Sequence, residues 1–189
     1  MKKLIIFGTG KISDAISYYF NRDSDYSIEG YVVDDAYTTT PIFLDKPVIP
    51  LSKVKEIFPP NKFLCFVAIG YQGMNGIRSS KYEHMKNEGY SFANYVSPHV
   101  KGSFSLGENS IVMDGAIIQP HVNFGNNVFV WGGCMVGHHA VVEDHCWLTG
   151  GCQIGGISTI GDHTFFGLGA VVGNEIVIGE KCMLGAGTL

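Results

Sequence analysis

The chain has 189 residues, of which 46% are hydrophobic and 16% charged; this excludes a disordered tail and allows one large domain or two small ones. A net charge of −4, without any cluster of Lys or Arg, argues against a nucleic-acid partner. No apolar run approaches the roughly 18 residues of a membrane span, and the N-terminal apolar stretch is too short for a secretory signal, so we expect a cytoplasmic protein.

The first half of the sequence alternates between buried-strand patterns and helical patterns. Short apolar runs that end in Gly, Asp or Pro predict strands, and apolar residues at helical spacing predict helices. The order predicts a parallel sheet with ligands bound at the carboxyl ends of its strands. The expected strands are residues 4–7, 28–33, 63–69 and 92–96; the expected helices are residues 11–21 and 77–87, with a short helix after Pro50 capped by Ser52.

A glycine turn follows the first expected strand. The pattern Gly8-x-Gly10-x-x-Ser13 lacks the third glycine of a dinucleotide fingerprint, which disfavours NAD. Two alternatives remain open: a turn without a ligand, or a helix N-terminus that binds the phosphate of a nucleotide sugar. Asp34 and Asp35, after the second strand, are either hydrogen-bond acceptors for a base or ribose or a solvated turn.

A repeat of six residues fills the second half. From Leu106 onward, the first position of all fourteen blocks is apolar, the second is Gly in nine of them, and the fifth is mostly small. This pattern predicts a parallel β-helix in which each block is a short strand and a turn, with the first position filling the interior. Four of the five cysteines fall at the fifth position; we expect them to be packed free thiols, and without a CxxC pair we expect no structural zinc.

The repeat resembles that of the left-handed β-helix acyltransferases, in which three blocks make one coil of 18 residues. Residues 18 apart are then expected to stack in columns about 4.8 Å apart. The columns divide into three corners: a glycine-rich corner with Gly115, Gly133 and Gly151; a polar corner, expected to face solvent, with Asn109, Asn127, His145 and His163; and a third corner with His121, His138, His139 and Gly156.

One outward-facing column is aromatic. Trp131 lies beside it, and an exposed ladder of this size is typical of an interface. We therefore expect homo-oligomerisation through this flank, and the resemblance implies a trimer. The members of the column are Ile111, Phe129, Trp147, Phe165 and Met183.

The whole arrangement resembles the nucleotide-sugar acetyltransferases of the bacillosamine and perosamine type, which are grouped with the sialic-acid O-acetyltransferases. This resemblance implies a Rossmann-like nucleotide-sugar-binding domain over residues 1–97. It also implies a left-handed β-helix acyltransferase domain over residues 98–189, which we expect to be truncated at its C-terminus. The resemblance is carried by Gly8-Thr9-Gly10-Lys11, Val33-Asp34-Asp35, Ala68-Ile69-Gly70 with Asn75 and Arg78, and Val136-Gly137-His138-His139.

The resemblance also implies roles for individual residues. His138 becomes the general base, and acetyl-CoA lies in the groove between neighbouring β-helices. The implied cofactor contacts are Trp147, Gly156, Leu168 and Ala186; the implied nucleotide-sugar site comprises Gly10, Lys11, Asp34, Asp35 and Gly70.

The sequence departs from the family pattern at three positions. His139 stands where the family usually has a carboxylate, and we expect either His139 or His121 to hydrogen-bond the base or the substrate. Lys11 stands where the bacillosamine enzymes tend to have His, and Trp147 replaces a polar cofactor contact.

The expected activity is direct transfer of an acetyl group from acetyl-CoA to the amine of a nucleotide-linked 4-amino-4,6-dideoxy sugar. O-acetylation of a sugar or of sialic acid is the first alternative. A zinc enzyme resembling carbonic anhydrase is less favoured because the stacked pair His121 and His139 supplies only two ligands, so we expect no metal. A scaffold that binds no acetyl-CoA is the non-catalytic alternative.

Overall fold

The computed structural model describes residues 1–189 and divides into two units. The first unit comprises residues 1–70 and 80–93, and the second comprises residues 71–79 and 94–189. The expected division at residue 97 lies close to residue 94, from which the chain stays in the second unit to its end. The earlier excursion of residues 71–79 has no counterpart among the expectations.

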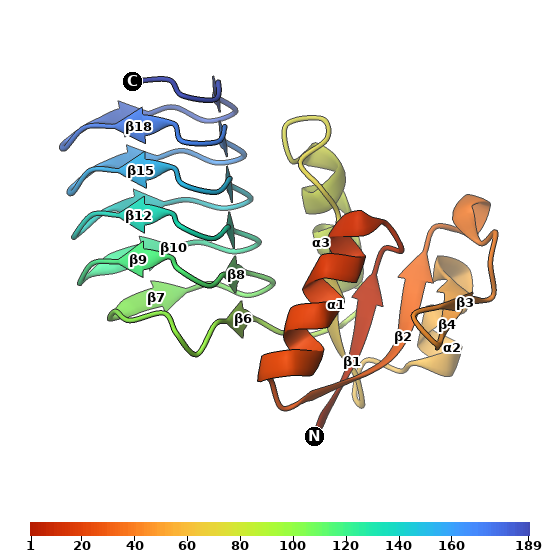
Figure 1. Ribbon diagram of the computed structural model, residues 1–189. Helices are drawn as coiled ribbons and strands as arrows, with labels where there is room; N and C mark the ends of the chain where they lie inside the picture. Colours follow the sequence, from red (N-terminus) through yellow and green to blue (C-terminus); the bar gives the residue numbers. More distant parts are fainter. The chain divides into compact units, whose positions relative to one another are not determined.

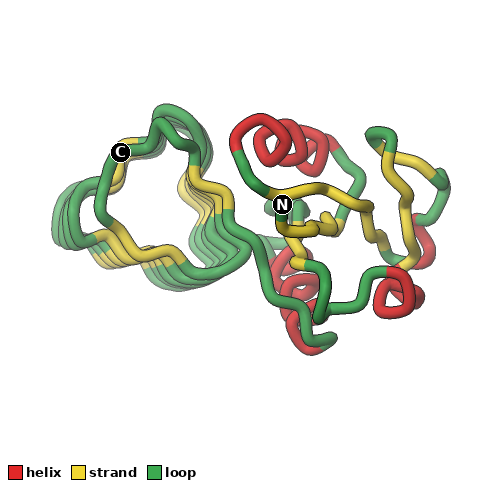
Figure 2. The backbone as a smooth tube through the Cα atoms, turned by 90° about the horizontal axis from the view of Figure 1, so that it is seen from below, coloured by secondary structure: helices red, strands yellow, loops and turns green.

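The first unit contains a five-stranded sheet with helices on both faces (Figure 2). The strands are β1 (Lys2–Phe7), β2 (Tyr26–Val33), β3 (Ile42–Phe43), β4 (Lys46–Pro50) and β5 (Leu64–Val67). The helices are α1 (Lys11–Asp23), the four-residue α2 (Val54–Ile57) and α3 (Gly76–Asn87), whose residues up to Ser79 belong to the second unit; 3₁₀ turns lie at Asp35–Tyr37 and Leu51–Lys53. The sheet order is β3-β4-β2-β1-β5, and all pairs are parallel except β3 with β4. The expected parallel sheet is therefore present, with an edge hairpin that the sequence pattern did not predict.

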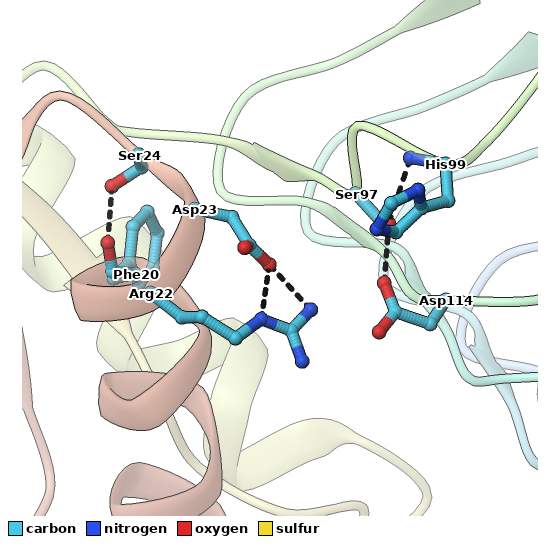
Figure 3. A network of polar contacts seen from close by, with 7 residues as sticks. All are labelled: Phe20, Arg22, Asp23, Ser24, Ser97, His99 and Asp114. Carbon is cyan, nitrogen blue, oxygen red and sulfur yellow. Dashed lines mark hydrogen bonds and ion pairs between the residues drawn. The ribbon is translucent and has the colours of Figure 1, made fainter.

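Helix α1 packs on the sheet through a short chain of buried hydroxyl groups. The Ser13 hydroxyl donates to the Gly8 carbonyl at 2.8 Å, and Tyr31 on β2 donates to the Ser17 hydroxyl at 2.9 Å. Because these buried groups satisfy one another, the polar residues of α1 can face the sheet. The helix ends where the Ser24 hydroxyl donates to the Phe20 carbonyl at 2.6 Å (Figure 3).

Two local expectations for the first half are wrong. Residues 92–96 do not form a fourth strand of this sheet: Phe92 makes a single bridge to Cys65, and Tyr95–Val96 (β6) pairs with the second unit instead. The apolar pattern could not distinguish the two sheets. Ser52 does not cap α2; its backbone N–H donates to the Asp35 carboxylate at 3.0 Å.

The second unit is a parallel β-helix that fits the left-handed class. Its strands form three sheets, β7 to β19, β6 to β20 and β9 to β18. Except for β6 with β8, paired residues of neighbouring strands are 18 residues apart, for example Phe129 with Trp147. Figure 1 shows the coils stacked above one another, and the view in Figure 2 shows them superimposed. After β6 the strands are β7 (Phe104–Leu106), β8 (Ile111–Val112), β9 (Ile117–Ile118), β10 (Val122–Phe124), β11 (Phe129–Val130), β12 (Met135–Val136), β13 (Val141–Val142), β14 (Trp147–Leu148), β15 (Gln153–Ile154), β16 (Thr159–Ile160), β17 (Phe165–Phe166), β18 (Val171–Val172), β19 (Val177–Ile178) and β20 (Met183–Leu184).

The interior of the β-helix confirms the reading of the six-residue repeat. The first-position residues from Val112 to Val172 are buried and form one apolar cluster. Cys134, Cys146 and Cys152 are free thiols buried in the same cluster, as expected from packing. The first coil is tied by Ser97, whose hydroxyl donates to the Asp114 carboxylate and accepts the His99 N–H at 3.2 Å (Figure 3).

The aromatic column on the sheet of β8, β11, β14 and β17 stacks as expected, but most of it is covered, and only its last member, Met183, is largely exposed. Ile111 and Phe129 are fully buried, and Trp147 is 3% exposed. Residues 71–79 cover the column, and the Tyr71 ring lies 5.5 Å from the ring of Trp147. The prediction of an exposed aromatic interface is therefore wrong, because the same chain supplies the cover. No helix of the chain is both long enough and apolar enough to cross a bilayer.

Candidate functional site

His138 lies at an exposed corner of the β-helix, two residues after β12. Its backbone N–H donates to the Gln119 side-chain oxygen at 2.9 Å, which fixes the turn. Its ring lies directly against Gly156 on the next coil, where an added Cβ would come within 2.9 Å of the His138 Nε2. Glycine at 156 therefore makes room for the imidazole, and the structure brings together two of the expected site residues.

His139 completes a pair with His138. The two Nδ1 atoms are 3.2 Å apart, so one ring donates a hydrogen bond and the other accepts it. The His139 ring also packs on the His121 ring, with centroids 4.7 Å apart. If the Nδ1 of His138 carries the hydrogen, its Nε2 is left as the proton acceptor, which is the state that a general base requires.

The positions expected to contact the cofactor lie on two corners and one covered face. Gly156 shares the corner of His138, while Leu168, 65% exposed, and Ala186 lie on the glycine-rich corner. The sheet of β9, β12, β15 and β18 connects these two corners, and its outward residue Ile117 is exposed. Trp147 is enclosed on a different sheet, which argues against direct contact with a cofactor.

The residues expected to hold a nucleotide sugar gather at one edge of the first unit. Because β2, β1 and β5 are parallel neighbours in this order, their carboxyl ends place Asp34, then Gly10 and Lys11, and then Gly70 along the same edge. The Ala68 N–H donates to the Phe7 carbonyl at 2.9 Å, so the turns after β1 and β5 lie against each other. Gly10 directly precedes α1, where no side chain caps the first backbone N–H groups.

The two aspartates differ in their partners. Asp34 accepts a hydrogen bond from the Lys81 ammonium at 2.6 Å, and this ammonium also lies 5.7 Å from the Phe7 ring. Hydrogen bonds from Ser52 lower the pKa of Asp35. Both aspartates line a pocket of about 430 Å³ together with Ser52, Lys55, His84 and other residues. Lys81 was missed from the sequence because it sits in an ordinary helical pattern, far along the chain from Asp34.

The corner that was expected to be solvated is largely buried. Asn109 and Asn127 are fully buried, and their side chains are joined by a hydrogen bond of 2.8 Å. Asn127 is joined in turn to the Nδ1 of His145 at 2.9 Å. The sequence shows that these positions repeat, but it cannot show that residues 71–79 cover them.

Arg78 supplies most of this cover. Its guanidinium is fully buried and donates to the carbonyls of Asn127 and His145 and to the Asn75 side chain. It also lies over the Phe129 ring at 4.4 Å. Asn75 donates in addition to the His163 carbonyl at 2.9 Å. Asn75 and Arg78, noted in the sequence as part of the resemblance, therefore attach residues 71–79 to the β-helix.

His145 makes the stability of this corner sensitive to acid. Burial, with a smaller contribution from the charge of His163, lowers the pKa of His145 to about 4, below the value of about 6.5 for an unfolded chain. The folded state therefore disfavours the proton, and the stabilisation is complete above pH 6.5 and is lost as the pH falls toward 4. We expect the free energy of unfolding to drop by about 1–2 kcal/mol between pH 7 and pH 5 through this group.

Urea unfolding of the wild type and of His145→Asn at both pH values measures this effect. Asn is already present one coil below, at Asn127, with the same left-handed backbone, so the variant keeps the corner geometry. We expect a smaller pH dependence in the variant, and an equal loss in both proteins would contradict the assignment.

Comparison with known proteins agrees with this fold. No family model and no curated protein matches the chain. Among solved structures, the acetyltransferase domain of PglB from Neisseria gonorrhoeae FA1090 is 24% identical with a TM-score of 0.85, covering 99% of this chain and 90% of that one. WeeI from Acinetobacter baumannii AYE is 18% identical with a TM-score of 0.78 and covers 99% of this chain and 90% of that chain.

A third similar structure is a mutant of perosamine N-acetyltransferase from Caulobacter crescentus in complex with CoA and GDP-perosamine. It is 23% identical with a TM-score of 0.68 and covers 99% of this chain and 87% of that chain. The PglB domain has also been solved with acetyl coenzyme A. The chain thus has the fold of these structures over nearly its whole length.

Proposed function

We propose that this chain is an acetyl-CoA-dependent N-acetyltransferase that acts on the amino group of a nucleotide-linked 4-amino-4,6-dideoxy sugar. The observation that carries the proposal is the imidazole of His138, exposed at a β-helix corner, seated on Gly156 and paired with His139. The similarity to structures that bind acetyl-CoA, or CoA with GDP-perosamine, supports the choice of substrates.

In this proposal His138 is the general base. Acetyl-CoA supplies the acetyl thioester, and the sugar amine attacks its carbonyl carbon, so that a C–N bond forms and the C–S bond breaks. The Nε2 of His138 takes the amine proton and returns it to the departing sulfur. His139 holds the Nδ1 hydrogen of His138 in place, which is the task that a carboxylate performs in the resembled family.

The first unit is proposed as a Rossmann-like nucleotide-sugar-binding domain, with Gly10, Lys11, Asp34, Asp35 and Gly70 at its site. The location of these residues at one sheet edge supports this assignment. The first backbone N–H groups of α1 also have no side-chain cap, and such groups are suited to bind a phosphate. The Lys81 ammonium offsets the charge of Asp34, which favours the approach of an anionic diphosphate.

The acetyl-CoA site is proposed to lie along Gly156, Leu168 and Ala186 and to be completed by a neighbouring copy in a homotrimer. The exposed sheet face between the two corners, which includes Ile117, supports this arrangement. The aromatic column is no longer part of the proposed interface, because residues 71–79 cover it. The cytoplasmic location stays a prediction from the sequence.

Incubation of the protein with acetyl-CoA and a panel of UDP-, dTDP- and GDP-linked 4-amino sugars tests the proposal. We expect thiol release with at least one 4-amino sugar and none with its 4-hydroxy counterpart. Acetyl-CoA is also expected to raise the melting temperature, because a ligand that binds only the folded state stabilises it. Release with 4-hydroxy sugars or sialic acid instead would establish O-acetylation. The absence of thiol release with every acceptor would overturn the proposed function, whether or not acetyl-CoA raises the melting temperature.

A further inference from the structure

Ile157 has a backbone conformation that its side chain disfavours. Its φ is +64°, in the left-handed region, and it is the one β-branched residue of the chain with a positive φ. At the equivalent positions of this corner, the other coils carry His121, His139 and Glu175, which are not branched at Cβ. The left-handed conformation is disfavoured for L-residues, and β-branching makes it less favourable still.

Packing in the apolar interior of the β-helix does not compensate for this strain. The Ile157 side chain is 53% exposed and belongs to no buried cluster. The fold uses the backbone of this residue, whose N–H donates to the His138 carbonyl at 2.8 Å, and an Asn or Gly would provide the same N–H without the strain. A strained residue that does not serve packing is a candidate for a functional role.

Its place in the corner suggests what that role is. Ile157 directly follows Gly156, the residue on which the His138 ring lies, and it stands one coil beyond His139 in the same column. Its exposed alkyl group is therefore next to the histidine pair, on a corner where its column neighbours are polar. The coil against which the Nε2 of His138 lies thus carries a partly exposed apolar side chain directly after Gly156.

We propose that Ile157 is a binding residue that contacts a methyl group of a substrate reacting at His138 and selects for it. Two substrates of the proposed function carry such a methyl: the acetyl group of the thioester and the C6 methyl of a 6-deoxy sugar. The inference rests on the proposed function, and the two methyl groups are distinguished by experiment.

Two substitutions separate the role of the side chain from that of the backbone. Ile157→Asn and Ile157→Gly both suit a left-handed residue and remove the alkyl group, so we expect both to raise the melting temperature by a few degrees. Lys181→Asn is the matched control: Lys181 has a φ of +53°, is exposed, and lies on a different corner from His138. The control is expected to show a similar or smaller thermal gain.

Calorimetric binding to the protein provides the decisive measurement. One arm compares acetyl-CoA with CoA, and the other compares a 6-deoxy nucleotide sugar with its 6-hydroxy counterpart. We expect the wild type and Lys181→Asn to bind the methyl-bearing member of one pair more tightly than its counterpart. In both Ile157 variants, the ratio of these two dissociation constants should fall about tenfold, while the ratio for the other pair stays unchanged.

The outcomes are separable from those of the activity assay. Unchanged selectivity in both pairs, or no binding of any of the four ligands, overturns the role of Ile157. Altered selectivity without thiol release by the wild type supports Ile157 as a binding residue and overturns the proposed function. Destabilisation by both Ile157 variants would show that the side chain serves the fold, and would also overturn the inference.

Discussion

Replacing His138 by Ala is expected to lower the turnover number by about 10²–10⁴-fold, the usual effect of losing a general base. The side chain is exposed and makes no contact needed by the interior of the β-helix, so the variant should fold with a melting temperature close to that of the wild type. Binding of acetyl-CoA should persist, because the change removes a proton acceptor but does not alter the residues of the proposed acetyl-CoA site. Steady-state thiol release with the best acceptor measures the loss.

His99→Asn is the control for this experiment. His99 is also exposed, and the hydrogen bond shown for it is made by its backbone, so the substitution should leave turnover unchanged (Figure 3). Near-normal turnover in a folded His138→Ala protein would remove His138 from the mechanism. A change in KM alone, with an unchanged turnover number, would make it a binding residue rather than the base.

Replacing Arg78 by Ala is expected to destabilise the protein by about 3–5 kcal/mol, because each buried acceptor left without its donor costs about 1–3 kcal/mol. The substitution leaves the Asn127 and His145 carbonyls without their donor and opens space beside Phe129. No carboxylate accompanies this cation, and burial lowers the pKa of Arg78 to about 9. The carbonyls and aromatic faces are therefore what keep the charge in place.

Arg78→Met distinguishes the loss of hydrogen bonds from the loss of volume. Met restores part of the packing, so urea unfolding should place it between the wild type and Arg78→Ala. Arg22→Ala serves as the control, since Arg22 forms a surface pair with Asp23 and should cost less than about 1 kcal/mol. A loss below about 1 kcal/mol in Arg78→Ala would show that residues 71–79 are held by other contacts.

The β-helix could be predicted closely because its sequence repeats. A period of six fixes which residues point inward, and a period of 18 fixes which residues stack, so the pairing of Phe129 with Trp147 and the contact of His138 with Gly156 both follow from counting. The first half has no such period. There the strand at Tyr95–Val96 was assigned to the wrong sheet, because an apolar run does not specify its partner.

The expectations that failed at the aromatic column and the polar corner share one cause. The sequence shows that Trp147 and Asn127 point outward, but not that Tyr71 and Arg78 lie on them. Contacts between segments about fifty or more residues apart leave no local signal. The same holds for Lys81, whose ion pair with Asp34 joins a helix to a strand end. The role of His138 stays a prediction, on which its motif and the repeat agree.

The path of the chain between its two units limits how the protein can be divided. The backbone passes from one unit to the other three times, after residues 70, 79 and 93. In the sequence, Arg78 is therefore separated from the β-helix residues to which it is bound by residues 80–93 of the first unit. A fragment that begins at residue 94 would keep every coil but lose residues 71–79, so that Phe129 and Trp147 would become an exposed apolar stripe. Excised or grafted versions of the β-helix therefore require residues 71–79 to be retained or this stripe to be redesigned.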